Sequence, residues 1–490
     1  MSDKRHDAAN PDIDSDVSGD VVDFLQRLAG ALKAKDVDEL QTLYEVELPA
    51  LTDRHYSVPH VYNQRGPKPQ MKHWPLPKYV KAHLGHPQVE LLYQLHQFRS
   101  QYSDRSVSAA VRKLAWSASD KAFEQFCAPS AAVDLPDCWI WDLVEEYLYQ
   151  LQTHRIRRLR PEQAQGFPAN VWSVQDAAAR LESAVTASGV REVLARVASG
   201  EAAPQDVIAR GDAHLRTVLG YSSLIGIVKL RVLLGDYAGA LDAAEALGVR
   251  SFGPTISATV PALHVTLYYH VGFAYLMLGR YSDAVATLQC ALAVKAGNRK
   301  FVESNQSQAV ALLLVAGTLG DLPAQEFATT VADRSRGAQD DDSVLLAQGD
   351  MERFRDVFLR ACPKFITAAD VTSGTTSSFS ETGQEAKELQ LRMFLRAVRL
   401  RVDVLKLRGY FGAYSALTTQ KVSSLLAASS SSPVEAHLIA TKNGSRQRVR
   451  TLGYKLTEGE VKRVGVVDFT ADKGNINVQR HFEQPTVAAS

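Results

Sequence analysis

The sequence is poor in cysteine, with only Cys127, Cys138, Cys290 and Cys362 among its 490 residues. No two of them form a C-x-x-C pair, and single thiols scattered along a long chain are typical of a reducing compartment. This spacing argues against a disulfide-stabilised secreted protein and favours a cytoplasmic one.

Long hydrophobic runs are also absent, although a helix that spans a membrane needs about 20 consecutive apolar residues. The uncharged run Val271–Gly279 ends at Arg280, and a second apolar run is interrupted by Lys229 and Arg231. The first 20 residues are polar and acidic and lack the apolar core of a signal peptide. We therefore expect a soluble protein that makes no contact with a membrane.

A charge excess of one sign is missing as well, since 55 lysines and arginines nearly balance 54 aspartates and glutamates. A formal net charge of +1 gives no reason to expect bulk attraction to nucleic acid, although local basic clusters can still bind it. The hydrophobic and charged fractions are those of an ordinary globular protein, and the length predicts two to four domains.

No constellation of catalytic or ligand-binding residues is evident. His83 and His86 have a spacing that could hold a metal ion, but no third ligand lies nearby, which favours a loop pair. Glu145 and Glu146 are adjacent on a predicted helix and point about 100° apart, which favours a solvated face. Cys362 has no candidate base and is expected to be a packing thiol. We therefore expect that the protein is not an enzyme and that it binds no cofactor, metal ion or small-molecule substrate.

Two segments, 233–247 and 276–292, resemble each other. Three positions match at a spacing of 44 residues: Gly235, Tyr237 and Ala240 with Gly279, Tyr281 and Ala284. Each segment follows an apolar helical stretch, so the glycine would end one helix, the tyrosine would wedge into the bend, and the alanine would let the next helix approach closely. Stacked copies predict an irregular, tetratricopeptide-like solenoid. The alternative is two unrelated hairpins in one helical domain.

The C-terminal region changes character. Ser432, Pro433 and Glu435 predict a helix start, and Asn443-Gly444 predicts its end. Segment 464–479 reads as a hairpin whose alternating apolar residues are Val467, Phe469, Ile476 and Val478. Helices followed by a two-stranded wing are the order of a winged helix.

The predicted fold is therefore mainly α-helical, with a helical-repeat solenoid followed by a C-terminal winged helix that carries a small β-hairpin. The expected regions are a disordered acidic tail at 1–20, an N-terminal helical region at 21–134 with a proline-rich loop at 57–77, the solenoid at 135–365, a flexible linker at 366–384, the final solenoid helix and winged helix at 385–480, and a disordered tail at 481–490.

Two basic clusters are candidate contacts with RNA or a partner. The first contains Arg155, Arg157, Arg158 and Arg160. It follows a predicted helix, and cations favour a helix C-terminus in any case. The second contains Arg446, Arg448 and Arg450. These alternate along an extended segment and could face a phosphate backbone or form a charged exposed face.

A solenoid that leads into a winged helix is the architecture of the PCI domain, which would cover about residues 270–480 here. Several stretches resemble the subunit L family of eukaryotic translation initiation factor 3, among them "GFAYLM" at 272–277 and "CPKF" at 362–365. The resemblance implies a non-catalytic scaffold whose partners are other subunits of that factor and the small ribosomal subunit, with direct contact to ribosomal RNA left open. It also implies a helical tail after the wing, whereas this chain ends soon after it. A PCI subunit of the proteasome lid or signalosome, or a free helical-repeat adaptor, is the alternative.

Overall fold

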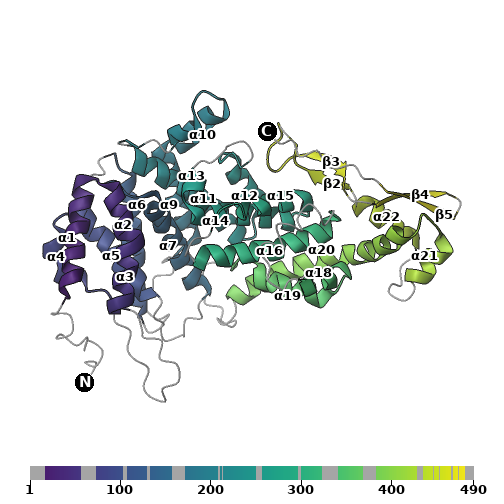
Figure 1. Cartoon of the computed structure of the whole chain (residues 1–490), viewed down its shortest axis with the longest axis horizontal. Helices are drawn as coiled ribbons and strands as arrows, with labels where there is room; N and C mark the ends of the chain where they lie inside the picture. The colour runs from purple at the N-terminus through teal and green to yellow at the C-terminus, as the bar shows by residue number, and fades with distance from the viewer. Residues whose placement is uncertain are drawn as a thin grey trace, which may run out of the picture. The chain divides into compact units, whose positions relative to one another are not determined.

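A computed structural model shows a mainly helical chain with small antiparallel sheets near the C-terminus (Figure 1). The predicted fold class is confirmed. The structure describes residues 17–56, 73–102, 107–129, 133–156, 172–207, 210–211, 213–249, 256–295, 300–322, 340–367, 382–426, 434–444, 446–451, 453–464, 467–472 and 474–480. Most of the predicted tails, proline-rich loop and linker, together with Arg157, Arg158, Arg160, Ser432 and Pro433, lie outside these residues. Within them, no helix combines the length and apolar character that crossing a membrane requires.

The chain divides into two compact units, each described by itself. Unit 1 comprises Met1–Gly226, Gly253–Thr259 and Ala369–Ser377, and unit 2 comprises Ile227–Phe252, Val260–Ala368 and Ser378–Ser490. The helical elements of unit 1 are α1 (Gly19–Ala34), α2 (Val37–Thr42), the π-helical turn η1 (Leu43–Glu47), α3 (Leu48–Leu51), a second π-helical turn η2 (Thr52–Tyr56), α4 (Pro77–Leu84), α5 (Pro87–Tyr102), α6 (Ala109–Cys127), α7 (Asp137–Ile156), α9 (Val174–Ser188), α10 (Val190–Ala198), the 3₁₀ turn η3 (Pro204–Val207), the first part of α11 (His214–Leu233) and α13 (Ile256–Thr259).

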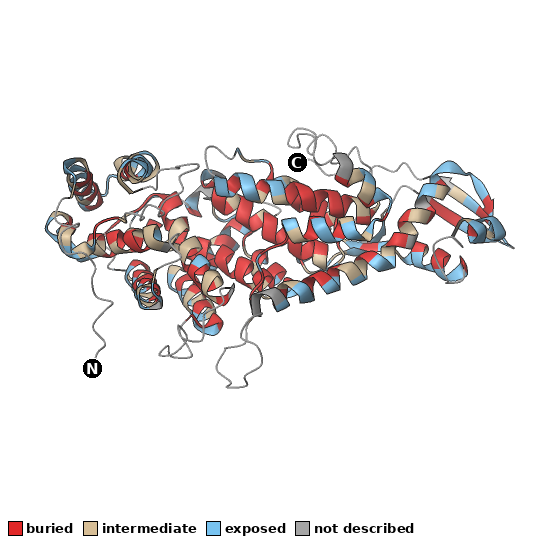
Figure 2. Cartoon of the chain, turned by 90° about the horizontal axis from the view of Figure 1, so that it is seen from below, coloured by how far each residue is buried: buried red, intermediate tan, exposed pale blue. Residues whose placement is uncertain are grey.

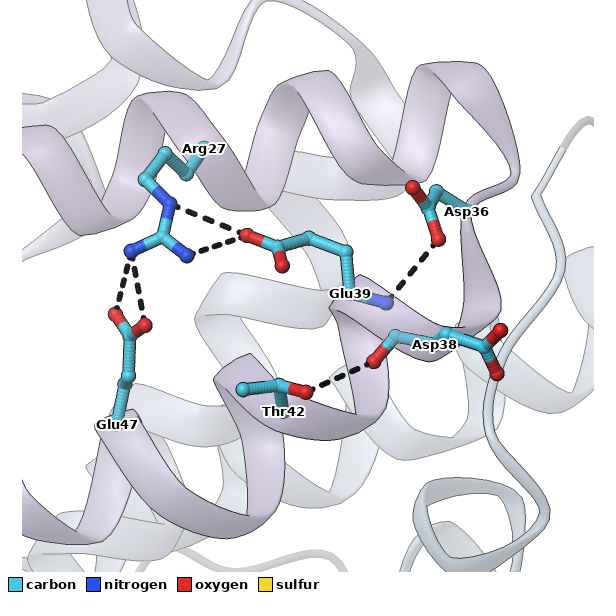
Figure 3. A network of polar contacts seen from close by, with 6 residues as sticks. All are labelled: Arg27, Asp36, Asp38, Glu39, Thr42 and Glu47. Atoms are coloured by element: carbon cyan, nitrogen blue, oxygen red, sulfur yellow. Dashed lines mark hydrogen bonds and ion pairs between the residues drawn. The ribbon is translucent and has the colours of Figure 1, made fainter.

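The first helices of unit 1 are joined by a polar network (Figure 3). The guanidinium of Arg27 on α1 lies between two carboxylates, bonding Glu47 Oε2 at 2.8 Å and pairing also with Glu39. Asp36 begins α2 by accepting a hydrogen bond from the backbone N–H of Glu39 at 3.1 Å. The network fixes the angle between α1 and the α2–η1 segment.

Trp74 is one centre of the unit 1 core. Its indole Nε1–H donates to Thr52 Oγ1 at 3.1 Å, and its ring meets the ring of His96 edge-on at 4.8 Å. A second aromatic contact is the stack of Trp116 on Tyr147, with ring centroids 4.2 Å apart. Ser173 caps the start of α9, because its hydroxyl accepts from the backbone N–H of Asp176 at 3.2 Å.

The helices of unit 2 form the repeats and lead into the winged helix. They are the second part of α11, α12 (Tyr237–Glu245), α14 (Pro261–Met277), α15 (Tyr281–Ala291), α16 (Lys300–Gly320), α18 (Asp340–Ala347), α19 (Met351–Ala361), α20 (Thr382–Ala413), α21 (Thr419–Leu426) and α22 (Val434–Gly444). Helix α14 contains the uncharged run Val271–Gly279 up to Met277, and it is buried on nearly every side (Figure 2). Its apolar character is that of a central core helix.

Three helices of unit 2 end in the same way. The glycine two residues beyond α11, α14 and α18 has a positive φ: 80° at Gly235, 71° at Gly279 and 78° at Gly349. Each glycine N–H bonds the carbonyl three residues earlier, and the following N–H bonds the carbonyl five residues earlier. This pairing satisfies carbonyls at the helix end, and glycine adopts the left-handed conformation without a Cβ clash. A repeated turn therefore joins the helices of the solenoid.

The winged helix contains a three-stranded sheet in the order β1-β5-β4. Strand β4 (Val467–Asp472) and strand β5 (Asn475–Arg480) form the hairpin, and the short strand β1 (Ala416–Thr418) adds to β5. Helix α22 ends at Gly444. The hydrophobic core of the winged helix takes residues from the end of α20, from β1, from α21 and α22, and from the wing strands. These residues are Leu407, Phe411, Leu417, Val422, Val434, Leu438, Phe469 and Ile476. The predicted wing is confirmed.

A second hairpin departs from the predicted pattern. Strand β2 (Arg446–Val449) pairs antiparallel with β3 (Glu460–Arg463), forming a separate two-stranded sheet between α22 and the wing. The sequence predicted an extended segment at 445–450 but no partner for it, and it did not predict β1. Strand β1 has three residues and strand β2 has four, and such short strands show no clear alternating pattern in a sequence.

Candidate functional site

Helices α21 and α22 form the helix-turn-helix pair of the winged helix, and α22 is its second helix, where nucleic-acid readers place their recognition residues. One side of α22 is buried in the domain core. The opposite side is exposed and consists of Glu435, Ala436, Ile439, Ala440 and Asn443. Ile439 has 61% of its surface accessible. This outer face is apolar with one acidic residue, and it contains no cation.

The one cation on the described part of α22 is held by the domain itself. Lys442 Nζ donates to Asp468 Oδ1 at 3.0 Å, is bonded also to the carbonyl of Phe469, and lies 5.1 Å from the centre of the Phe469 ring. Burial raises the pKa of the Asp468 carboxyl, but the hydrogen bonds from Lys442 and the Phe469 backbone and the charges of Lys442 and Arg463 together outweigh it, so this pKa lies below its usual value. Lys442 therefore fastens α22 to the wing and is not presented to a partner.

Phosphate contacts are made by lysine, arginine and polar side chains that point outward from a recognition element. The outer face of α22 has no lysine or arginine, and its exposed residues offer apolar surface, a carboxylate and one amide. The exposed isoleucine offers apolar surface, which another protein can cover and a phosphate backbone cannot. We regard this face as the candidate interface of the winged helix.

Strand β2 of the β2–β3 hairpin has one buried residue, whereas all four residues of β3 are exposed. Gln447 is buried, and its Nε2–H donates to the carbonyl of Gly320 on α16 at 3.1 Å. Arg446 and Arg448 are exposed on the other side, where Arg448 lies opposite Val461. Arg450 lies beyond the strand, and its backbone N–H donates to Asp283 Oδ1 at 3.0 Å. Only Arg446 and Arg448 of the second predicted cluster thus share one exposed face.

The loop between β2 and β3 is anchored in the repeats. Arg280 and Asp283 form an ion pair in which both side chains are 6% exposed, with Arg280 Nε 2.7 Å from Asp283 Oδ2. The guanidinium also donates to the carbonyl of Leu456 at 2.6 Å, and the Tyr275 hydroxyl donates to the same oxygen at 3.3 Å. The hairpin is therefore held against α14 and α15.

The first predicted basic cluster is described only at Arg155. This side chain is buried, and its Nη2 donates to the carbonyl of Trp172 at 3.0 Å. The helix-terminal arginine thus contributes to the packing of unit 1. Arg157, Arg158 and Arg160 remain a proposal for contact with RNA or an acidic partner.

The predicted repeat residues lie at helix–helix contacts in unit 2. Tyr237 is buried and donates its hydroxyl hydrogen to Gln390 Oε1 on α20 at 2.6 Å, and Tyr281 lies 4.7 Å beneath the guanidinium of Arg401. Ala240 and Ala284 are fully buried. The repeats are thereby fastened to the long helix that leads into the winged helix. A Cβ on Gly235 would lie 2.6 Å from Gln390 Nε2, so a side chain at this position would displace the end of Gln390.

The third turn was missed in the sequence although it shares part of the motif. Gly349 is followed by Asp350 and Met351, much as Gly235 is followed by Asp236 and Tyr237. A Cβ on Gly349 would lie 3.0 Å from Val402 on α20. The Gly-Asp pair before a helix was the available signal, but the methionine and the spacing of 70 residues from Gly279 concealed it.

The histidines and the cysteine considered as catalytic or metal-binding candidates in the sequence do not come together in one site. His83 Nδ1 lies 3.4 Å from Gln26 Nε2, whereas His86 Nδ1 accepts from the backbone of Gln88. Among the residues that the structure describes, no three His, Cys, Asp or Glu side chains are grouped as metal ligands. Cys362 is buried, and burial raises its pKa to about 11, the opposite of what a nucleophilic thiolate requires.

The expectation that Glu145 and Glu146 lie on a solvated face was wrong for Glu146. Its side chain is only 16% exposed and lies 4.0 Å from Arg99 Nε on α5. Arg99 also bonds Asp142 at 3.0 Å, and Asp142 accepts from the Tyr44 hydroxyl at 2.7 Å. Helix α7 is covered on this side by α5 and η1, so its carboxylates belong to an internal polar cluster.

Comparisons with known proteins agree with the resemblance seen in the residues. The family model described as "RNA polymerase I-associated factor PAF67" matches residues 112–488. Relatives named "Eukaryotic translation initiation factor 3 subunit L" are similar over most of the chain. That of Aedes aegypti is 26% identical over 497 residues, covering 94% of this chain and 88% of the relative. That of Monosiga brevicollis is 25% identical over 489 residues, covering 95% and 92%. That of Danio rerio is 28% identical over 366 residues, covering 71% and 62%.

Proposed function

This chain belongs to the family described as RNA polymerase I-associated factor PAF67, and we propose that it is a non-catalytic scaffold subunit of eukaryotic translation initiation factor 3. In that role it acts in the cytoplasm. It holds neighbouring subunits while the complex assembles on the small ribosomal subunit and recruits messenger RNA.

The observation that carries the proposal is the outer face of α22. Its centre, Ile439, is a large apolar side chain with 61% of its surface accessible, and the flanking residues are Ala436 and Ala440. A winged helix that read nucleic acid through this helix would expose cations there. The cation-free face supports binding to another polypeptide, as a scaffold requires.

The mechanism is positional. Buried contacts between the repeats, α20 and the β2–β3 hairpin hold the parts of unit 2 in one arrangement, so that partners bound to it are held at defined positions. Binding free energy in such interfaces is concentrated in a few well-packed apolar side chains. Ile439 is the candidate for such a residue on α22.

The test is affinity capture of the tagged full chain from cells that express it, with quantitative mass spectrometry. We expect wild type to recover other subunits of initiation factor 3 and small-subunit ribosomal proteins. The Ile439→Asp variant should recover about tenfold less of the other subunits than wild type, because the interface would then bury the charge of an aspartate. The matched control is Val344→Asp on α18, a valine that is 55% exposed.

Other results would overturn the proposal. Recovery of proteasome-lid or signalosome subunits would assign the chain to a sibling complex. Recovery of RNA polymerase I subunits in place of translation factors would favour the association named in the family description. A monodisperse chain that recovers no subunits would favour a free helical adaptor.

A further inference from the structure

Helix α20 presents three large apolar side chains on its outer side. Leu389, Met393 and Leu400 are 48%, 53% and 72% exposed. At about 100° per residue, their spacings of four and seven residues place them within about 40° of one another. Figure 2 shows the long helix that leads to the C-terminal sheet with buried residues on one side and exposed residues on the other. The three side chains therefore form an apolar stripe, which Arg396 borders between Met393 and Leu400.

The opposite side of α20 is already occupied. Phe394 stacks on Phe358 of α19 with ring centroids 4.5 Å apart, and Val398 is fully buried. The packing of α20 on the repeats thus leaves the stripe uncovered and does not use it.

Three exposed arginines, Arg392, Arg396 and Arg399, lie along one edge of the stripe. Their positions on the helix fall about 20° to 80° to one side of Leu389. None of them forms an ion pair with any part of the chain that the structure describes. On the neighbouring helices α18 and α19, by contrast, Arg353 and Arg360 both bond the carboxylate of Asp342.

We propose that this face of α20 binds an amphipathic helix of another polypeptide, with apolar residues along one side and acidic residues beside them. The apolar stripe spans about three helical turns, or about 16 Å, which suits helix-to-helix packing. Carboxylates of the partner would pair with the unpaired arginines. The inference rests on the proposed function in assuming a chain that works by binding other polypeptides.

Two other occupants fit the face less well. A second copy of the chain would bring arginines against arginines, which is unfavourable for like charges. A nucleic acid backbone would pair with the arginines but leave Met393 and Leu400 without apolar partners. An acidic amphipathic helix satisfies both halves of the surface.

The first experiment measures binding of the full chain to a synthetic amphipathic peptide of about 20 residues with a leucine stripe flanked by glutamates. We expect saturable binding that weakens with salt. The triple variant Arg392→Glu/Arg396→Glu/Arg399→Glu should bind about tenfold or more weakly. The same peptide with lysines in place of glutamates should bind the triple variant better than wild type.

Two matched controls separate the surface from general effects. Arg355→Glu changes another exposed arginine, on α19, and should leave the affinity unchanged. Met393→Ser/Leu400→Ser should weaken binding without changing the salt dependence, whereas Val344→Ser should have no effect. Equal affinity of wild type and the triple variant for the glutamate peptide would overturn the inference.

The second experiment places a photoreactive residue at Met393 in the full chain within its purified native complex, with a control at Val344. A cross-link from position 393 to an acidic helical segment of another polypeptide is the expected result. Cross-links to RNA, to this chain itself, or to nothing would overturn the inference while leaving the proposed function standing if the other subunits co-purify. Absence of those subunits would count against the proposed function instead.

Discussion

Arg280 Nη1 donates to the backbone carbonyl of Leu456 at 2.6 Å, joining residues that are 176 positions apart. Arg280 begins the second helix of a repeat, and Leu456 lies in the loop of the β2–β3 hairpin. The same guanidinium pairs with Asp283, which in turn accepts from the backbone N–H of Arg450. One buried ion pair thus binds both sides of the loop, and it connects the repeats to the segment that precedes the wing.

We expect Arg280→Met to release this loop. The substitution keeps an apolar stem but leaves the Asp283 carboxylate buried without its counter-charge, and breaking such a pair typically costs about 3–5 kcal/mol. Hydrogen exchange with mass spectrometry should show faster exchange of the Arg450 and Leu456 amides.

The control for this loop is Arg355→Met, which breaks an exposed ion pair with Glu352 on α19. Exposed pairs contribute about 0–1 kcal/mol, so exchange at 450–459 should remain as in wild type. Unchanged exchange in Arg280→Met itself would show that the hairpin loop does not depend on the pair.

Gly272 lies where α14 packs against Leu288 of α15. A Cβ at this position would lie 2.6 Å from Leu288 Cγ, so Gly272→Ala must displace the Leu288 side chain or push the two helices apart. We expect a loss of about 1–3 kcal/mol in the free energy of local opening, measured as faster amide exchange across α14 and α15.

Gly409→Ala on α20 provides the matched control. A Cβ there meets no atom within 4 Å, and alanine favours a helix over glycine by about 0.5–1 kcal/mol. This variant should slow exchange around position 409. If both variants behaved alike, the close packing at Gly272 would not explain the need for glycine.

Local signals in the sequence predicted much of the solenoid and wing. The turns at Gly235 and Gly279 need glycine for a reason that acts within a few residues, and the alternation from Val467 to Val478 reports a sheet with one buried face. The Gly349 turn was missed because its helix starts with methionine.

The candidate interfaces could not be predicted in the same way. Ile439 and Leu400 look like core residues in a sequence, and only their position opposite a packed face shows that they are exposed. Glu146 looks like a solvated residue, because its burial comes from α5 and η1 and not from its own helix. The exposure of Ile439 and Leu400 and the burial of Glu146 all depend on tertiary packing, which a periodic pattern along one helix does not contain.

Glu146 should make the stability of unit 1 depend on pH. Burial raises its pKa from 4.5 to about 7, against the opposing effect of Arg99. Because the folded pKa lies above the unfolded one, the folded state holds the proton more tightly, and stability falls as pH rises from about 4.5 to 7. Glu146→Gln should remove this loss, about 3 kcal/mol at pH 8 and little at pH 4.5.

Tryptophan fluorescence in urea suits this measurement, because all five tryptophans lie in unit 1. His96 in the same unit acts in the opposite direction, since burial lowers its pKa to about 3 and stability falls as pH drops below 6.5. Comparing Glu146→Gln with wild type at each pH cancels that contribution. A constant difference between the two proteins from pH 4.5 to 8 would contradict the assignment.

Contact between the β2–β3 hairpin and ribosomal RNA would have a distinct signature. Arg446 and Arg448 lie on one face with Arg463 and Val461, their cross-strand partners, and Arg463 is also paired with Asp468. Each phosphate contact to a single strand adds about 0.7 to the slope of log affinity against log salt concentration. We expect Arg446→Gln/Arg448→Gln to reduce that slope by about 1.4 for single-stranded RNA, measured by fluorescence anisotropy. Lys421→Gln, an exposed lysine on α21, should leave it unchanged. An equal slope in wild type and the double variant would mean that these arginines form an exposed charged face without contact to phosphate.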